Sequence, residues 1–399
     1  MTTGFLFADE MDLAEQRVLL RLDVNAPIQD GQVSDDTRIR RILPGLQALV
    51  AMRAKIIILT HFGRPKGKIV PALSIQPVVD CMAKLLGQPV AVETDVVGPG
   101  GVAAVAALQA GQILMMENLR FYPEEEANDV GFAKKLAALG DIYVGDAFSC
   151  AHRAHTSTHA LAQHLPAYAG PALMAEVNAL KTALETPKRP VAAVVGGAKI
   201  STKLDVLTHL ISRVDHLILG GGMANTFLAA QGYDMAGSLM EADLVDTAKN
   251  ILKSASEKGC AIHLPKDGQA AREFKKGADA RIIANEALAK DEMMLDIGPK
   301  AVASYSAVIR EAKTVLWNGP MGAFEIPPFD AGTNGLARYV ADCTVDGLVS
   351  IAGGGDTVAA LNHAGCADKF SYISLAGGAF LEWIEGRELP GIAILDSAP

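Results

Sequence analysis

A run of three glycines followed by an acid and a threonine is well suited to bind a phosphate group. The glycines at 353–355 follow an apolar, strand-like segment at 348–352, and Asp356 and Thr357 begin a helix-like segment. Because glycine has no Cβ atom, backbone N–H groups at such a turn can approach a ligand closely. An acid at the start of a helix is also a common N-cap. The stretch therefore predicts either a helix cap or a phosphate-binding turn with a Mg²⁺-binding carboxylate beside it.

Basic and polar side chains follow the apolar runs of the N-terminal half, at 18–22, 55–60, 112–116 and 142–144. Ligands of parallel α/β sheets bind at the carboxyl ends of the strands. The side chains at these ends, with one from the polar lead-in to the first helix, are Asp23, Asn25, Arg38, His61, Arg64, Arg120 and Arg153. One such arginine alone is more often a surface charge or an ion-pair partner. Because guanidinium groups match carboxylate and phosphate oxygens, arginines at successive strand ends of an acidic chain predict binding of a phosphorylated organic acid.

The strands of the C-terminal half end in glycines instead of arginines. Glycine-rich turns follow the apolar runs at 191–195, 216–219, 314–317, 348–352 and 371–375. One such turn is weak evidence, because glycine is common in tight turns. Five of them at successive strand ends favour a site where backbone N–H groups and helix N-termini hold a polyphosphate and a flat base.

His152, His155 and His159 are spaced three and four residues apart, so a helix would place them on one face. Such a face could bind a metal ion. However, Arg153 lies within the cluster, and no cysteine or paired carboxylate completes a ligand set of familiar spacing. Anion binding or helix capping is therefore the favoured interpretation of these three residues.

Short apolar strands alternate with helical patterns along the chain, which is typical of parallel sheets covered on both faces. The helical patterns of the N-terminal half lie at 40–52, 75–86 and 130–139. An amphipathic segment at 173–184 ends at a proline-containing stretch, 186–190, and the strand ends change character directly after it. We therefore expect an α/β protein of two domains with a connecting helix between them.

Length and composition limit the class of protein. The chain has 399 residues, half of them apolar and 20% charged, which suits two globular domains. A net charge of −9 argues against a nucleic-acid-binding protein. The uncharged stretch at 96–116 is broken by proline and glycine, which predicts a helix and a strand and no membrane span. Five dispersed cysteines and an N-terminus unlike a signal peptide favour a cytoplasmic location.

The common nucleotide-binding motifs are missing from the sequence. It has no GxxxxGK[ST] segment and no protein-kinase signature, and no GxGxxG follows the first strand of either half. The glycine-rich turns therefore predict a nucleotide site of another kind. An anion-binding half and a nucleotide-binding half are together suited to phosphoryl transfer, in which closure over the ligands excludes water.

The motifs of this sequence, taken together, closely resemble those of the phosphoglycerate kinase family over nearly the whole chain. The motifs that carry the resemblance are RLDVNAP (21–27), DDTRIR (35–40), HFGRP (61–65), ENLRFYPEEE (117–126), AHRAH (151–155), GGAKISTK (196–203), WNGPMGAFE (317–325), GGGDT (353–357) and FLEWIEGRELPG (380–391). Their occurrence in this order is highly specific.

The resemblance implies two Rossmann-like three-layer αβα domains with mainly parallel sheets, joined by a connecting helix and a hinge. The expected parts are an N-terminal 3-phosphoglycerate-binding domain at 1–172, joined by the C-terminal segment 387–399, a connecting helix at 173–187 and a nucleotide-binding domain at 188–386. The implied reaction is reversible phosphoryl transfer between 1,3-bisphosphoglycerate and MgADP, giving 3-phosphoglycerate and MgATP, in glycolysis and gluconeogenesis. The family also implies Mg²⁺ as cofactor, a monomer that closes its domains, and no nucleic-acid or membrane partner.

The resemblance also assigns site residues by motif. Asp23 and Asn25 resemble residues that hydrogen-bond the glycerate, and the basic patch of the family corresponds to Arg38, His61, Arg64, Arg120 and Arg153. The implied nucleotide-binding residues are Gly197, Lys199, Lys203, Gly221, Gly222, Asn318, Glu325, Gly354, Gly355, Asp356 and Thr357. Asp356 is the implied Mg²⁺ ligand.

Within this set the family implies particular roles. Lys199 and Lys203 would face the nucleotide phosphates, Glu325 would contact the ribose, and Gly221 with Gly222 would line the adenine slot. The candidate catalytic residues are Arg38, Lys199 and Lys203. The acceptor is already anionic, so no general base is expected, and catalysis reduces to alignment and charge stabilisation.

The sequence departs from the family pattern at a few positions. Leu375 stands where the family usually has a threonine, so its side chain is left out of the predicted site. Ser149 and Cys150 replace the usual Gly-Thr before the AHRAH motif, and Gly145 replaces a residue that normally bears a side chain. These changes beside Arg153 could alter affinity without altering the class of enzyme.

Two other functions are compatible with parts of the sequence. A catalytically silent nucleotide-binding regulator could use the same scaffold, although such a protein would be expected to lack the phosphate-site lysines or Asp356. An NAD-dependent dehydrogenase would also need a nucleotide site, but the absent GxGxxG disfavours it.

Overall fold

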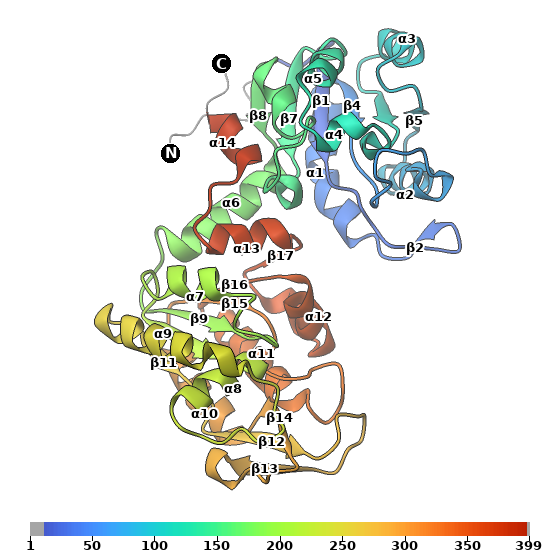
Figure 1. Cartoon of the computed structure of the whole chain (residues 1–399). Coiled ribbons are helices and arrows are strands. Elements are labelled where there is room, and N and C mark those ends of the chain that lie inside the picture. Colours follow the sequence, from blue (N-terminus) through green and yellow to red (C-terminus); the bar gives the residue numbers. More distant parts are fainter. Residues whose placement is uncertain (1–11, 397–399) are drawn as a thin grey trace. The chain divides into compact units, whose positions relative to one another are not determined.

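The computed structural model describes residues 12–396, which fold into two compact units. The first unit runs to Val177 and also takes the residues from Glu388 onward, while the second spans Asn178–Arg387. Each unit contains a six-stranded sheet whose neighbouring strands are all parallel (Figure 1). The expected α/β class with mainly parallel sheets is confirmed.

The sheet of the first unit has β1 near its middle. In spatial order its strands are β5 (Val90–Glu93), β6 (Ile113–Met116), β4 (Lys55–Leu59), β1 (Arg17–Leu22), β7 (Ile142–Asp146) and β8 (Ala167–Ala169). A two-stranded hairpin comprises β2 (Ile28–Gln29) and β3 (Gln32–Val33). The helices are α1 (Thr37–Ala51), α2 (Gln76–Leu86), α3 (Pro99–Ala107), α4 (Pro123–Glu126), α5 (Val130–Ala137) and α14 (Pro390–Asp396). Single 3₁₀ turns are η1 (Pro71–Leu73), η2 (Leu119–Phe121), η3 (Phe148–Cys150) and η4 (Ala160–Gln163).

The side chains of β1 alternate between the two faces of the sheet, which separates Leu20 and Leu22 from Arg21. Val18, Leu20 and Leu22 belong to one buried hydrophobic cluster, together with Leu46 of α1. Side chains of a strand point alternately to the two faces of the sheet. Arg21 therefore points to the opposite face from Leu20 and Leu22, where it is fully buried.

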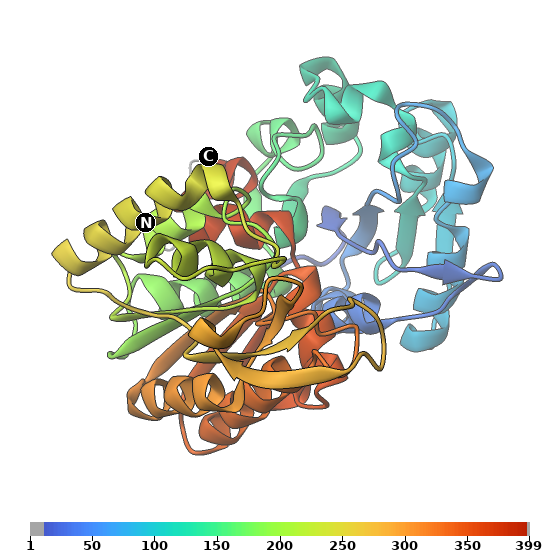
Figure 2. The same cartoon turned by 60° about the horizontal axis from the view of Figure 1, so that its bottom comes forward.

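The second unit repeats the parallel architecture. In spatial order its large sheet contains β11 (Ala261–His263), β10 (His216–Leu219), β9 (Val191–Val195), β15 (Thr314–Asn318), β16 (Val349–Gly353) and β17 (Tyr372–Ser374). Its helices are α7 (Leu204–Leu210), α8 (Gly221–Ala230), α9 (Val245–Glu257), α10 (Pro299–Glu311), α11 (Ala331–Val345), α12 (Gly355–His363) and α13 (Gly378–Ile384). Three 3₁₀ turns are η5 (Ala242–Leu244), η6 (Asn285–Ala287) and η7 (Ala367–Lys369). Figure 2 shows helices on both sides of this sheet.

Helix α6 (Pro171–Leu184) passes from the first unit to the second, because the division between the units falls between Val177 and Asn178. Across residues 12–396 no helix has both the length and the apolar sequence that crossing a membrane requires. The helix and strand expected within 96–116 are α3 and β6.

A three-stranded antiparallel sheet in the second unit was not expected from the sequence. Its order is β13 (Ala280–Ala284), β12 (Asp267–Ala271), β14 (Met293–Ile297). Strand β12 has the sequence DGQAA, which contains no β-branched or aromatic residue. Its burial by neighbouring elements, and not its own propensity, makes it a strand.

The order of the strands places a topological switch point in each large sheet. In the second unit β9 is followed on one side by β10 and β11, whereas the later strands β15, β16 and β17 lie on its other side. In the first unit β4 and β7 likewise flank β1. Since the carboxyl ends of strands at a switch point form the ligand crevice of such sheets, the sites are expected beyond β1 and β7, and beyond β9 and β15.

Candidate active site

Asp23 follows β1 directly and is the centre of a polar cluster. Its Oδ2 accepts hydrogen bonds from the Arg38 guanidinium and the Ser149 hydroxyl, and its Oδ1 accepts one from the Asn25 backbone N–H at 3.0 Å. Burial opposes ionisation, but the Arg38 charge and the Ser149 hydrogen bond hold the pKa of the Asp23 carboxyl below its usual value. Two of the predicted substrate residues are therefore an ion pair in the free protein.

His61, at the end of β4, lies in the same cluster. Its Nδ1 is 3.1 Å from Nη2 of Arg21 and 3.8 Å from the Cys150 thiol. Burial, and next the charge of Arg21, lower the pKa of His61 to about 3, so the ring is neutral at pH 7. Because a guanidinium only donates, Nδ1 must be the acceptor and Nε2 must carry the proton. His61 offers a hydrogen-bond donor and no positive charge.

Asp23, His61 and Cys150 are close enough to be considered as metal ligands, since their ligand atoms all lie within 4.8 Å of one another. Two guanidinium groups oppose this use. Arg38 pairs with Asp23, and Nη2 of Arg21 contacts both His61 and the Cys150 sulfur, the latter at 3.7 Å. A cation would have to enter against both charges, so the arrangement favours an anion.

Arg21 is a buried part of this cluster that the sequence did not single out. Its Nε donates to the Ser157 hydroxyl at 2.8 Å, and that hydroxyl donates to Oε1 of Glu125 at 2.6 Å. The Ser157 backbone N–H donates to the other Glu125 oxygen at 2.9 Å. A fully buried arginine and a fully buried glutamate thus share one serine. The available signal was an arginine within the apolar run of β1, between Leu20 and Leu22.

The loop after β4 is held by two of the predicted residues. Nη1 of Arg120 donates to the Gly63 carbonyl at 2.8 Å, and the Gly63 N–H donates to Oδ1 of Asn25 at 3.2 Å. Arg64 and Arg153 are exposed, and within residues 12–396 neither side chain forms an ion pair. Both charges are therefore open to an incoming anion.

The three histidines of the AHRAH region do not share a helix face. His152 lies in a turn, His155 lies in an irregular segment, and His159 directly precedes the 3₁₀ turn η4. The shared helix face that a metal site would have needed is therefore missing from residues 151–159, whereas anion binding by this segment stays a prediction. Nδ1 of His159 lies 3.2 Å from the side-chain nitrogen of Asn128, which ties this segment to the end of α4.

In the second unit Lys203 joins the ends of β9 and β15. Its Nζ donates to the Gly196 carbonyl at 2.6 Å and to the Asn318 carbonyl at 3.0 Å. Burial, opposed by the charge of Asp356, lowers the pKa of Lys203 to about 8. Gly319 has a φ of 99°, and a Cβ atom there would lie 2.7 Å from Nζ. The position thus requires glycine, and the lysine ammonium lies at the carboxyl ends of both strands.

The turn after β16 has the conformation that the glycine run predicts. Gly354 has a φ of 96°, and α12 begins at Gly355, so Asp356 and Thr357 lie in its first turn. Thr357 is buried, and its hydroxyl accepts the Gly319 N–H at 2.7 Å. The Asp356 carboxylate is exposed and does not cap the helix. The N-cap interpretation of Asp356 is therefore wrong.

Asn318 locks this turn to the end of β15. Its Nδ2 donates to the Gly353 carbonyl at 2.8 Å, while its buried Oδ1 has no hydrogen-bond partner among the described residues. Asn318 is 4% exposed. The predicted residues Lys203, Asn318 and Thr357 are thus brought together by the glycine-rich turns.

The turn after β10 lies against the same loops. The Gly221 N–H donates to the Met321 carbonyl at 2.7 Å, and the Met223 N–H donates to the Gly197 carbonyl at 3.0 Å. Gly222 is the second residue of α8. The turns at the ends of β9 and β10 and the loop after β15 therefore form one continuous backbone surface.

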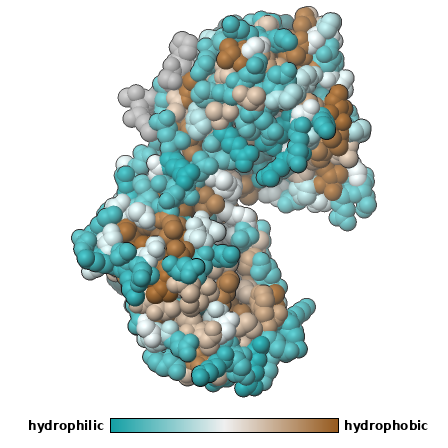
Figure 3. All heavy atoms as spheres, viewed as in Figure 1, coloured by the Kyte–Doolittle hydropathy of each residue, from teal (hydrophilic) through white to brown (hydrophobic). Residues whose placement is uncertain are grey.

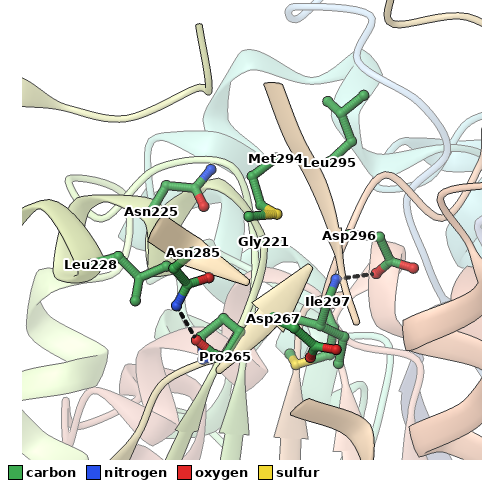
Figure 4. Close-up of a pocket in the computed structure, with 11 residues that line it drawn as sticks. Gly221, Asn225, Leu228, Pro265, Asp267, Asn285, Met294, Leu295, Asp296 and Ile297 are labelled. Atoms are coloured by element: carbon green, nitrogen blue, oxygen red, sulfur yellow. Dashed lines mark hydrogen bonds between the residues drawn. The ribbon is translucent and has the colours of Figure 1, made fainter. Parts of the chain in front are cut away.

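A small hollow adjoins this surface (Figure 4). It is lined by Gly221, Asn225, Leu228, Pro265, Asp267, Asn285, Met294, Leu295, Asp296, Ile297 and Met321. Only Gly221 among them was predicted. Met321 belongs to the loop after β15, and the others come from α8 and from the unexpected antiparallel sheet and the segments beside it. Burial raises the pKa of the Asp296 carboxyl to about 8, so the lining has few charges.

Lys199 and Glu325 are exposed, on the loop after β9 and the loop after β15 respectively. Within the described residues neither side chain forms a hydrogen bond or an ion pair with another predicted nucleotide residue. Their roles, like those of the other site residues, stay predictions.

The two units present different chemistry at equivalent places in their sheets. One gathers guanidinium groups around a buried acid at the strand ends, and the other gathers glycine-rich backbone around a half-buried lysine. This combination defines a class, the two-domain α/β phosphotransferases, in which one domain takes a small phosphorylated acid and the other a nucleotide.

Comparisons with known proteins agree with this class. A sequence model of the family described as phosphoglycerate kinase matches residues 8–387. The chain is 57% identical over 395 residues to the phosphoglycerate kinase of Ruegeria sp. (strain TM1040), covering 99% of this chain and 100% of that protein. It is 55% identical over 391 residues to that of Agrobacterium fabrum, covering 98% of each. The chain belongs to the phosphoglycerate kinase family.

Solved structures give the same result. The phosphoglycerate kinase from Coxiella burnetii matches with a TM-score of 0.92 at 42% identity, covering 99% of this chain and 100% of that one. The enzyme from Pyrococcus horikoshii OT3 matches with a TM-score of 0.83 at 28% identity and 99% coverage of each chain. The resemblance noted in the sequence and its assignment as a kinase are confirmed.

Proposed function

We propose that this chain transfers a phosphoryl group reversibly between the acyl phosphate of 1,3-bisphosphoglycerate and MgADP, giving 3-phosphoglycerate and MgATP. The observation that carries the proposal is the pairing of Asp23 with Arg38 at the end of β1, within a cluster of guanidinium groups that favours an anion. Membership of the phosphoglycerate kinase family supports it.

For the acid we propose the residues Asp23, Asn25, Arg38, His61, Arg64, Arg120 and Arg153. The exposed charges of Arg64 and Arg153 suit a phosphate and carboxylate arriving from solvent. Neutral His61 and the Asp23–Arg38 pair suit the hydroxyl and carboxyl groups of the glycerate, which need matched donors and acceptors.

For the nucleotide we propose Lys199, Lys203, Glu325 and the glycine-rich turns of the second unit. Asp356 fits a Mg²⁺ ligand, because its carboxylate is exposed, does not cap α12 and lies near enough to Lys203 to influence its charge. When bound, Mg²⁺ would neutralise charge on the nucleotide phosphates.

The reaction needs no general base in this chain. Both the carboxylate of 3-phosphoglycerate and the terminal phosphate of ADP are already anionic, so no proton has to be removed from the acceptor. The chain must instead align two anions that repel each other and stabilise charge on the moving phosphoryl group. We assign that stabilisation to Arg38, Lys199 and Lys203, and the half-buried position of Lys203 strengthens its field.

Binding of MgADP should depend on pH through Lys203. The phosphates favour the charged lysine, but burial lowers its pKa to about 8 in the free protein. Above that pH binding must take up a proton, so affinity should fall by up to about tenfold per pH unit. Below pH 8 the lysine is already charged and affinity should be level. Titration calorimetry between pH 7 and 9.5, in buffers of different ionisation enthalpy, would measure both the affinity and the proton uptake.

Conservative variants test whether Lys203, and not another group, causes the pH dependence of MgADP affinity. K203R keeps its charge throughout this range and should remove the slope, whereas K199R should retain it. A slope that persists in K203R would show that another group titrates.

The remaining expectations are proposals of the same kind. We propose the domain division at 1–172 with 387–399, 173–187 and 188–386, a monomer, a cytoplasmic location, and no nucleic-acid or membrane partner. The net charge of −9 argues against a nucleic-acid partner, and the dispersed, free cysteines support a cytoplasmic location.

The decisive experiment is a coupled assay of ATP consumption with 3-phosphoglycerate and MgATP. We expect turnover that requires both substrates and is lost on chelation of Mg²⁺. Binding of MgADP without any turnover would instead identify the silent regulator, and failure to bind either ligand would refute the proposal. A matched reaction with glycerate in place of 3-phosphoglycerate tests the need for the substrate's phosphate.

A further inference from the structure

We propose that Glu241 is a positioning residue for phosphoryl transfer, because it fixes the loop that carries Lys199. The inference rests on the proposed function and adds a residue to it. The loop at 196–203 joins β9 to α7, and Glu241 lies just before the 3₁₀ turn η5. Neither a motif nor a charge pattern in the sequence pointed to Glu241.

The Glu241 carboxylate holds the middle of the lysine loop. Its Oε1 accepts the Ser201 hydroxyl at 2.5 Å, and its Oε2 accepts the Ser201 backbone N–H at 2.9 Å. The hydroxyl and the backbone N–H of one loop residue therefore converge on a single carboxylate, which fixes the backbone two residues after Lys199.

The other end of this connection is rigid. The Glu241 N–H donates to the Thr226 hydroxyl at 3.1 Å, and Nδ2 of Asn225 donates to the Leu239 carbonyl at 3.1 Å. Thr226 and Asn225 are buried residues of α8. Glu241 is thus hydrogen-bonded to helix α8 through its backbone and to the lysine loop through its carboxylate, so it fixes the loop relative to the helix.

Near Lys199 the side chains of the lysine loop are mostly exposed, and a further restraint is the Thr202 hydroxyl, which donates to the Lys199 carbonyl at 2.9 Å. Ala198, Lys199, Ser201 and Thr202 are all exposed, whereas the Ile200 side chain is buried. Lys203 is held separately by two carbonyls. Loss of the Glu241 contact should therefore let the Lys199 ammonium shift, while Lys203 stays in place.

The Glu241 carboxylate could have a second role, which has to be distinguished from positioning of the loop. The charge of Lys199 acts on Glu241, so the acid could instead compete with nucleotide phosphates for that lysine. Positioning predicts that removal of Glu241 lowers kcat. Competition predicts tighter MgADP binding with kcat unchanged.

The test compares E241A, S201A and the double variant with the unsubstituted protein in the coupled assay. We expect E241A to lower kcat by about tenfold to a hundredfold with the KM for 3-phosphoglycerate unchanged, because a displaced Lys199 weakens the transition state more than the ground state. S201A keeps the hydrogen bond from the Ser201 backbone position to Glu241, so its kcat should fall less than that of E241A. The double variant should be no slower than E241A, because both changes remove the same contact.

A matched control and a measurement of the loop complete the test. Glu257, exposed on α9 and 3.9 Å from Lys253, offers E257A, which should leave kcat unchanged. Amide exchange of residues 197–202 should be faster in E241A and unchanged in E257A. An E241A protein with unaltered kcat, or with tighter MgADP binding and unaltered kcat, would overturn the inference. Absence of turnover in the unsubstituted protein would refute the proposed function instead.

Discussion

Replacement of Arg38 by alanine is expected to lower kcat by about 10²–10³-fold. The Arg38 guanidinium pairs with Asp23 in the free protein, so it is already held at the strand ends where the acid is proposed to bind. Alanine removes a charge proposed to face the moving phosphoryl group, and that charge counts for more in the transition state than in the ground state. The coupled assay at saturating substrates would measure the loss.

The affinity of this variant for MgADP should stay close to that of the unsubstituted protein, because the proposed nucleotide residues all lie in the second unit. The kcat of R38K should lie between those of R38A and the unsubstituted protein, since lysine keeps the charge but lacks the planar fork of the guanidinium.

Arg40 supplies the matched control on the same helix. It is exposed and pairs with Asp36 four residues earlier. R40A should keep kcat within about twofold, as expected for an exposed ion pair of small free energy. Near-normal turnover in R38A would remove Arg38 from the chemistry, whereas equal losses in R38A and R40A would point to a general effect of charge on α1.

The sequence predicted which residues end strands but not which strands are neighbours. Asp23, His61, Lys203 and Asp356 all follow apolar runs, and parallel sheets put such positions on one edge. The order of the strands depends on packing between distant segments, which leaves no local pattern. The contact of Lys203 with both Gly196 and Asn318 could therefore not be foreseen.

Residues missed in the site are those whose partners are far along the chain or whose strands have weak patterns. Glu125 and Ser157 are 32 positions apart, and Arg21 and Ser157 are 136 apart. Asp296 of β14 and Asn285, directly after β13, line the hollow from a sheet whose strand β12 lacks β-branched residues. Periodicity reports which face of an element is buried, but it does not report which buried polar groups meet.

Replacement of the buried Arg21 by methionine is expected to lower the free energy of unfolding by about 3–5 kcal/mol. Methionine is similar in length, so the main change is the loss of a charge and its hydrogen bonds. Glu125, fully buried, would keep the Ser157 hydrogen bonds but lose the guanidinium that offsets its charge. Urea unfolding followed by circular dichroism at pH 7 would measure the change.

Arg17 on the same strand is the control for this substitution. Its pair with Asp141 is partly exposed, with 37% and 36% of the two side chains accessible. R17M should therefore cost about 1 kcal/mol or less, because solvent screens the pair. Equal costs at the two positions would show that burial of the Arg21 network adds nothing.

The pH dependence of the R21M variant should identify Glu125 as the source of the loss. Burial already raises the pKa of Glu125, and removal of the Arg21 charge, which lowers it, should raise it further. A carboxyl whose pKa is higher in the folded state favours folding below its unfolded pKa and loses that contribution as pH rises through the folded value. The loss of unfolding free energy in R21M should consequently be largest at neutral pH and shrink towards pH 4.

The double variant R21M/E125Q, which leaves no uncompensated charge, should recover part of the stability at pH 7. A double variant no more stable than R21M, with a deficit independent of pH, would mean that lost packing around Arg21 and not the charge of Glu125 sets the cost.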